Sequence, residues 1–170
     1  MTNHPQNSRV HCLSSRQLPG QGLLRRKVSR LPIGGLLVLA SLVLFGCQKE
    51  PPKAVDIGKD ELCTSCRSMI VDKHYAAEFI TKDGFVRKFD DLACMIQHAK
   101  KVKRDSIAAF FAMDFPSTQW MPAQDGKYVR SDKFKTPKDG GVLAFKDPAK
   151  AQALATQYQA QLLSFDDLMK

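Results

Sequence analysis

The sequence predicts an α+β fold of two ββα units in one small domain, which we place at residues 58–170. Three observations support this prediction. Two β-rich segments joined by an Asp-Gly turn are followed at once by helix signals. Further β-rich segments and a second helix start come later in the chain. The tripeptides Phe89-Asp-Asp and Phe145-Lys-Asp mark the same strand-to-helix step in both halves, as an internal repeat would.

The first unit is expected at residues 75–99. Strands are predicted at 75–81 and 85–89, because both segments are rich in β-forming residues and Asp83-Gly84 is typical of a hairpin turn. Asp90 is predicted to cap the helix that follows, by accepting hydrogen bonds from its free backbone N–H groups. That role accounts for Asp90 without catalysis or metal binding. The apolar residues at helical spacing are Leu92, Met95, Ile96 and Ala99.

The second unit is expected in the rest of the chain. Strands are predicted at residues 107–113, 128–129 and 141–145. A helix should then begin after Asp147 and run to about Tyr158, because Asp is a good cap and Pro148 suits the first helical position.

The N-terminal residues 1–46 are typical of a secretory signal peptide. Four basic residues between 25 and 30 precede the uncharged run 31–46, which is short for a membrane-spanning helix. The run ends in Gly46-Cys47 and resembles the bacterial lipobox, so Cys47 is expected to be lipidated. An uncleaved membrane anchor is the alternative. Gln48 follows the pattern that lipoprotein families associate with the outer membrane, and we expect a periplasm-facing lipoprotein there.

Residues 47–57 are polar and contain prolines, which is typical of a flexible tether. Six basic and no acidic residues lie in 1–46, so residues 47–170 carry 20 basic against 17 acidic side chains. This balance does not support nucleic-acid binding. The sequence also has no convincing nucleophile-and-base pair, phosphate loop or pair of catalytic carboxylates, and we therefore expect no enzymatic activity.

A group of sulfur-containing residues is the candidate metal site. Two cysteines three residues apart can turn both sulfurs toward one point, and thiolate with thioether ligands selects Cu(I). The predicted ligands are Cys63, Cys66, Met69, Cys94, Met95 and His98. Cys63 and Cys66 are the leading candidates, and Met69 comes next.

Other interpretations of these residues stay open. A structural zinc site would use Cys63, Cys66, Cys94 and His98. A redox pair would use Cys63 and Cys66 alone. Cys94 and Met95 also fit a buried helix face, where both would serve only in packing.

The sequence resembles the NosL-type lipoproteins, which are copper chaperones for the maturation of nitrous-oxide reductase. The resemblance covers about residues 63–145. It rests on the following matches: Cys63-x-x-Cys66, Tyr75-Ala-Ala-Glu78, Lys88-Phe-Asp-Asp-Leu92 with Cys94-Met95, Asp114, Trp120, Tyr128-Val129, Thr136-Pro137, Gly140-Gly141 and Ala144-Phe145.

This resemblance implies two treble-clef-like ββα units that hold one Cu(I) through cysteine and methionine sulfur. It also implies delivery of copper to an apo-enzyme, directly or with an ABC-type maturation complex. Two positions depart from the family pattern. Ser68 stands where the family has methionine, with Met69 one place later, and Lys138 replaces a second methionine.

Overall fold

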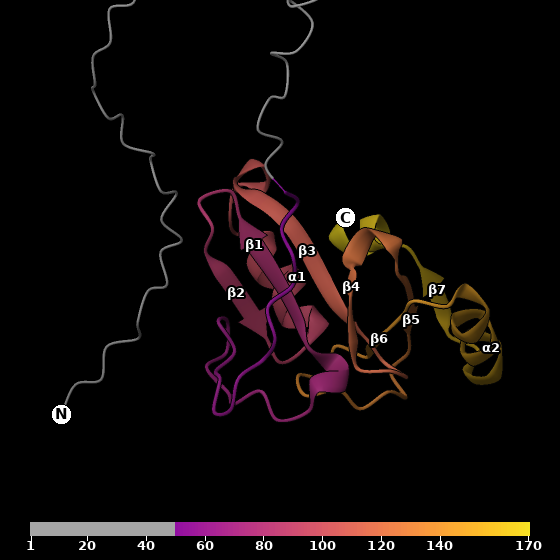
Figure 1. Ribbon diagram of the computed structural model, residues 1–170. Helices are drawn as coiled ribbons and strands as arrows, with labels where there is room; N and C mark the ends of the chain where they lie inside the picture. The colour runs from indigo at the N-terminus through magenta and orange to yellow at the C-terminus, as the bar shows by residue number, and fades with distance from the viewer. Residues whose placement is uncertain (1–49) are drawn as a thin grey trace, which may run out of the picture. The chain divides into compact units, whose positions relative to one another are not determined.

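The computed structural model describes residues 50–170, which form two antiparallel sheets with the strand orders β2-β1-β3-β4 and β6-β5-β7 (Figure 1). The strands are β1 (Ala77–Thr81), β2 (Val86–Phe89), β3 (Ile107–Asp114), β4 (Gln119–Pro122), β5 (Lys127–Arg130), β6 (Val142–Phe145) and β7 (Gln161–Leu163). The helices are α1 (Leu92–Ala99), α2 (Pro148–Tyr158) and α3 (Phe165–Met169), with 3-10 turns η3 (Lys73–Tyr75), η4 (Arg104–Ser106) and η5 (Ala123–Asp125). The α+β class that the sequence predicts is confirmed.

Both predicted ββα units are present. The hairpin β1-β2 leads into α1, and the hairpin β5-β6 leads into α2. The place of β3 differs from the prediction, which assigned it to the second half. It pairs with β1 in the first sheet, where Phe110 lies opposite Phe79 and both rings are buried in one core.

The start of α1 corrects a second prediction. The residue that caps this helix is Asp91 and not Asp90, because β2 ends at Phe89 and the chain needs one more extended residue before the helix begins. The Asp91 carboxylate accepts a hydrogen bond of 2.7 Å from the N–H of Ala93. The start of α2 is as predicted, with Asp147 as cap and Pro148 in the first turn.

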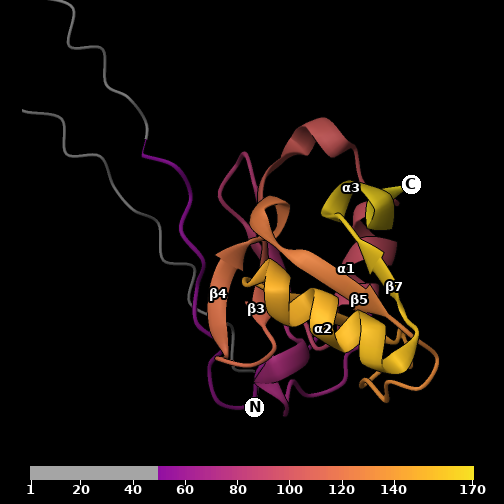
Figure 2. The ribbon, with the colours of Figure 1, turned by 90° about the vertical axis from the view of Figure 1, so that its right-hand side faces the viewer.

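The second sheet lies between two apolar clusters, because its side chains alternate between the two faces. Val142 and Ala144 of β6 contribute to the main core, whereas Leu143 and Phe145 pack toward α2. Figure 2 shows α2 in front of this sheet, and α1 packs on β1 and β2 of the first sheet. Because β6 is buried on both faces, all four of its residues, 142–145, are apolar.

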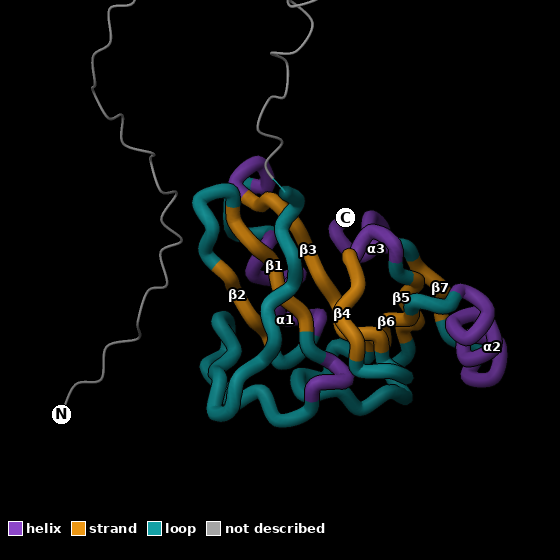
Figure 3. Tube along the Cα trace, in the orientation of Figure 1, coloured by secondary structure: helices purple, strands orange, loops and turns teal. Residues whose placement is uncertain are grey.

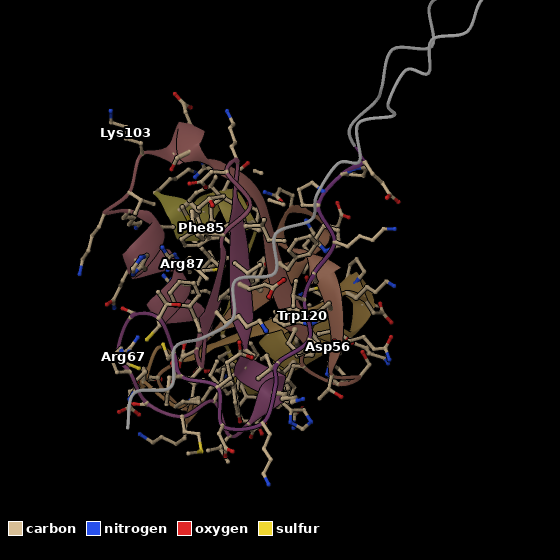
Figure 4. The ribbon with its side chains drawn as sticks, turned by 60° about the vertical axis from the view of Figure 1, so that its left-hand side comes forward. Asp56, Arg67, Phe85, Arg87, Lys103 and Trp120 are labelled. Carbon is tan, nitrogen blue, oxygen red and sulfur yellow. The ribbon has the colours of Figure 1, made fainter. Side chains whose placement is uncertain are left out.

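A strap formed by residues 54–57 crosses the first sheet on the face opposite α1 (Figure 1). Charged side chains hold its backbone: Glu78 accepts from the N–H of Val55, Lys88 donates to the carbonyl of Asp56, and Lys73 donates to that of Ile57. Figure 4 shows Asp56 on the strap near Trp120 of β4, and both residues line one pocket. The last residues of the expected tether thus contact the domain.

The expected signal peptide, the lipidation residue Cys47 and the first part of the expected tether lie outside the described residues. Within residues 50–170, no helix has the length and apolar character needed to cross a bilayer.

Loops from both halves of the chain gather at one end of the domain, the lower end in Figure 3. The first loop, residues 61–70, carries Cys63 and Cys66, and we call it the cysteine loop. The second, residues 131–141, joins β5 to β6. The end of β2 and the start of α1 lie between them in sequence and supply the remaining residues of the candidate site.

Candidate metal centre

The cysteine loop is a closed turn that places its two thiols side by side. Its ends are joined by a β-bridge between Leu62 and Met69. Inside it, the N–H of Cys63 donates to the carbonyl of Ser68 at 2.8 Å, and the N–H of Arg67 donates back to the carbonyl of Cys63 at 3.0 Å. Arg67, at the outer side of the loop in Figure 4, has a φ of 64°, a left-handed conformation that lets the chain turn back.

The loop is fixed to the first sheet through Thr64, whose N–H donates to the carbonyl of Lys88 on β2 at 2.8 Å. Two residues after Lys88 comes Asp90, and α1 then brings Cys94 into its first turn. The strand end, the loop and the helix start therefore meet at one place.

Four side chains form the candidate centre at this point. A donor atom of each of Cys63, Cys66, Asp90 and Cys94 lies within 4.8 Å of the other three. All three cysteines are free thiols. Cys63 and Cys94 are buried and Cys66 is exposed, so the group is closed toward the core and open at one sulfur.

The three thiols have different electrostatic environments. Burial raises the pKa of Cys63, and a hydrogen bond with Asp90 raises it further. Burial also raises the pKa of Cys94 strongly, with the negative charges of Cys63 and Asp90 adding to the effect. Burial opposes ionisation of Cys66 too, but its hydrogen bonds with Ser68 and Cys63 outweigh this effect and lower the pKa of Cys66. Cys66 is thus the thiol that ionises most readily, and the thiolate is the form that binds metal.

Asp90 belongs to this group and does not cap the helix. Its side chain is almost completely buried, and its two oxygens lie 3.5 and 3.6 Å from the sulfur of Cys66, which donates to them. The prediction that a structural cap explains Asp90 is therefore wrong. The sequence did contain a sign of this second role, because two consecutive acids stand at the helix start and only one of them can occupy the capping position.

The remaining predicted ligands lie in different surroundings. Met69 is about half exposed at the end of the cysteine loop. Met95 has no exposed surface and packs in the main core. His98 lies against the rings of Phe79 and Phe89, at centroid distances of 5.9 and 5.4 Å, and burial lowers its pKa. His98 is not part of the donor group of residues 50–170.

Chemically, three thiols and one carboxylate can hold a single soft or borderline metal ion. Thiolate sulfur suits Cu(I) and Zn²⁺, and a carboxylate oxygen is a zinc ligand but a poor Cu(I) ligand. The open side at Cys66 allows another ligand to reach a bound ion.

Comparisons with known proteins agree with this architecture. The NosL family model matches residues 54–170. A crystal structure of the copper chaperone NosL from Shewanella denitrificans superposes with a TM-score of 0.61, covering 69% of this chain and 96% of that chain at 18% sequence identity. A search of curated protein sequences gave no significant match. Because the family model covers more than half of the sequence, the chain belongs to the NosL family.

Proposed function

We propose that this protein is a copper chaperone that binds one Cu(I) through cysteine sulfur and transfers it to a cuproenzyme. The observation that carries the proposal is the convergence of Cys63, Cys66 and Cys94 in a chain of the NosL family. The structural neighbour from Shewanella denitrificans is itself described as a copper chaperone. Sulfur ligands stabilise the soft Cu(I) ion, whereas Cu(II) prefers nitrogen and oxygen ligands.

The shape of the centre suits transfer by ligand exchange. With two buried thiols and one exposed thiol, a recipient's donor atom can bond to copper while the bond from copper to Cys66 breaks. The half-exposed Met69 at the loop end is a candidate for an additional, weaker ligand during this exchange. Copper leaves as the cargo and no covalent chemistry is required, so the proposal includes no enzymatic activity.

The recipient and the cellular location extend this proposal. The family resemblance supports nitrous-oxide reductase, or an ABC-type maturation complex that serves it, as the recipient. The signal-peptide pattern of residues 1–46 and Cys47 support a lipid-anchored protein facing the periplasm, in the outer membrane. Fatty-acid labelling of the parent that disappears in Cys47→Ala would support the anchor, and an uncleaved leader would contradict it.

A structural zinc site is the second candidate, and the observation in its favour is the buried Asp90 oxygen among the donors. In that case the metal would be permanently held and would contribute to folding. A metal competition experiment distinguishes the copper chaperone from the structural zinc site. The reduced protein is offered Cu(I) or Zn²⁺ in competition with chelators of known affinity. A preference for zinc, with loss of folding on chelation, would exclude the chaperone.

The copper site predicts a graded response to substitution. Cys63→Ser and Cys66→Ser should each weaken Cu(I) binding at least about a hundredfold, because hydroxyl oxygen is a hard ligand. Met69→Leu should weaken binding about fivefold and leave the fold intact, since the side chain is half exposed. Met113→Leu, a buried methionine on β3, is the matched control and should bind as the parent does. Parent-like binding by both serine variants would place the site elsewhere.

A further inference from the structure

Lys138 reaches the candidate metal centre from a distant part of the chain. It lies on the loop between β5 and β6, and that loop is tied to the start of α1 by Asp91. One oxygen of Asp91 accepts from the hydroxyl of Thr136 at 2.6 Å and from the backbone N–H of Lys138 at 3.0 Å. The backbone position of Lys138 is therefore set by a buried carboxylate and does not depend on its own side chain.

Close packing on α1 fixes the loop further. A Cβ atom built on Gly140 would lie 2.4 Å from the Cβ of Ala93, a separation that real atoms do not adopt. Gly140 thus lets the loop lie directly on the first turn of the helix that carries Cys94. The backbone of Lys138 and the helix turn that carries Cys94 are consequently held together.

The Lys138 side chain extends to the open side of the centre. Its Nζ donates to the hydroxyl of Ser68 at 2.8 Å and lies 4.0 Å from an oxygen of Asp90. Ser68 and Asp90 each lie 3.5 Å from the sulfur of Cys66. The ammonium group is therefore separated from this sulfur by one hydroxyl on one side and one carboxylate on the other.

A cation is needed at this place once copper is bound as proposed. Cu(I) offsets only one of the negative charges of the two or three thiolates that bind it, so together with the buried Asp90 carboxylate these leave an excess of negative charge in a partly desolvated centre. Among the ion pairs of residues 50–170, only the one between Lys138 and Asp90 involves a member of the donor group.

We propose that Lys138 is the internal counter-ion of the copper centre, and that it slows copper release by stabilising the negatively charged copper–thiolate form. It acts through Ser68 and Asp90 and is not a ligand. The inference rests on the proposed Cu(I) function and specifies how tightly this site retains its cargo.

The test measures the rate at which Cu(I) passes from the loaded protein to an excess of a chromophoric chelator at low salt. Lys138→Gln should release copper about tenfold faster, because the Lys138 side chain is only 34% exposed and its charge is incompletely screened. Lys138→Arg keeps the charge and should stay within about twofold of the parent. Raising the salt concentration should reduce the difference between Lys138→Gln and the parent.

Lys135→Gln is the matched control, since it removes the same charge from an exposed side chain of the same loop. It should release copper at the parental rate. Thermal unfolding of the metal-free proteins confirms that each variant folds. Parental release by Lys138→Gln, or equally fast release by the Gln and Arg variants, would overturn the counter-ion role alone. Failure of the parent to bind Cu(I) would instead overturn the proposed function.

Discussion

Glu78 is a carboxylate that lies in the interior of the protein. Its side chain lies fully buried beneath the strap, where one oxygen accepts from the N–H of Val55 at 2.8 Å and the other has no protein partner. Burial raises the pKa of Glu78 to about 7, although the Val55 hydrogen bond and the charge of Lys88 act in the opposite direction. Glu78 therefore exchanges its proton near neutral pH in the folded protein.

The raised pKa of Glu78 predicts a loss of stability with rising pH. Between pH 4.5, the ordinary value, and pH 7 the folded protein keeps a proton that the unfolded chain releases, so the free energy of unfolding falls as pH rises through this window. Glu78→Gln keeps an acceptor for Val55 and removes the titration. Relative to the parent, this variant should gain about 2.5 kcal/mol between pH 5 and pH 8.

Urea unfolding at pH 5 and pH 8 measures this effect as a difference between the two proteins, which cancels the other titrating groups. Glu50→Gln changes an exposed carboxylate that precedes the strap in the chain and serves as the control. An identical pH dependence in the parent and Glu78→Gln would show that Glu78 does not carry the effect.

At the scale of elements, the start of α1 joins the two halves of the site. Asp91 caps the helix through one oxygen and holds the β5–β6 loop through the other, with three donors in all. The start of α2 is simpler, because Asp147 accepts only from the N–H of Ala149 and is exposed. The same local pattern, an Asp before a helix, thus makes three side-chain hydrogen bonds at α1 and one at α2.

Asp91→Ala should lower the free energy of unfolding by about 3 kcal/mol, because it leaves several buried donors without a partner. Asp147→Ala should cost only about 1 kcal/mol, the usual value for an N-cap. Chemical denaturation of both variants measures the contrast. Equal losses would mean that the contacts of Asp91 to Thr136 and Lys138 contribute nothing to stability.

At the scale of the whole molecule, Phe165 of α3 connects the two sheets. Its buried ring lies 5.1 Å from that of Phe110 on β3 and 6.1 Å from that of Tyr128 on β5, measured between centroids. The C-terminal helix therefore closes the main core between the first and second sheets. We expect the two ββα units to unfold together because they share this core.

Phe165→Ala should destabilise the protein by about 4 kcal/mol while the unfolding transition remains single. Phe85→Ala, at a half-exposed ring in the β1-β2 hairpin, should cost less than about 1 kcal/mol. Circular dichroism and Trp120 fluorescence, followed during denaturation, report on the whole fold and on β4. Two separate transitions in the parent would contradict the shared core.

Features set by short-range chemistry were determined by the sequence alone. Asp83-Gly84 dictates the hairpin, Asp147-Pro148 dictates the start of α2, and the spacing of Cys63 and Cys66 brings two sulfurs together. Each depends on residues only a few positions apart, whose backbone preferences act locally. The short elements β4, β7 and α3 escaped prediction because segments of three to five residues carry little periodicity.

Only the tertiary structure decided which distant residues complete the centre. The choice of Asp91 over Asp90 as cap depends on where β2 ends against β1, and it leaves Asp90 free to face the cysteine loop. Lys138 lies 70 residues beyond Ser68, and its contact requires the β5–β6 loop to pack on α1. The pairing of β3 with β1 likewise depends on tertiary packing, because it buries Phe79 and Phe110 in the main core. Such contacts are selected by burial and packing across the whole domain, which no local pattern records.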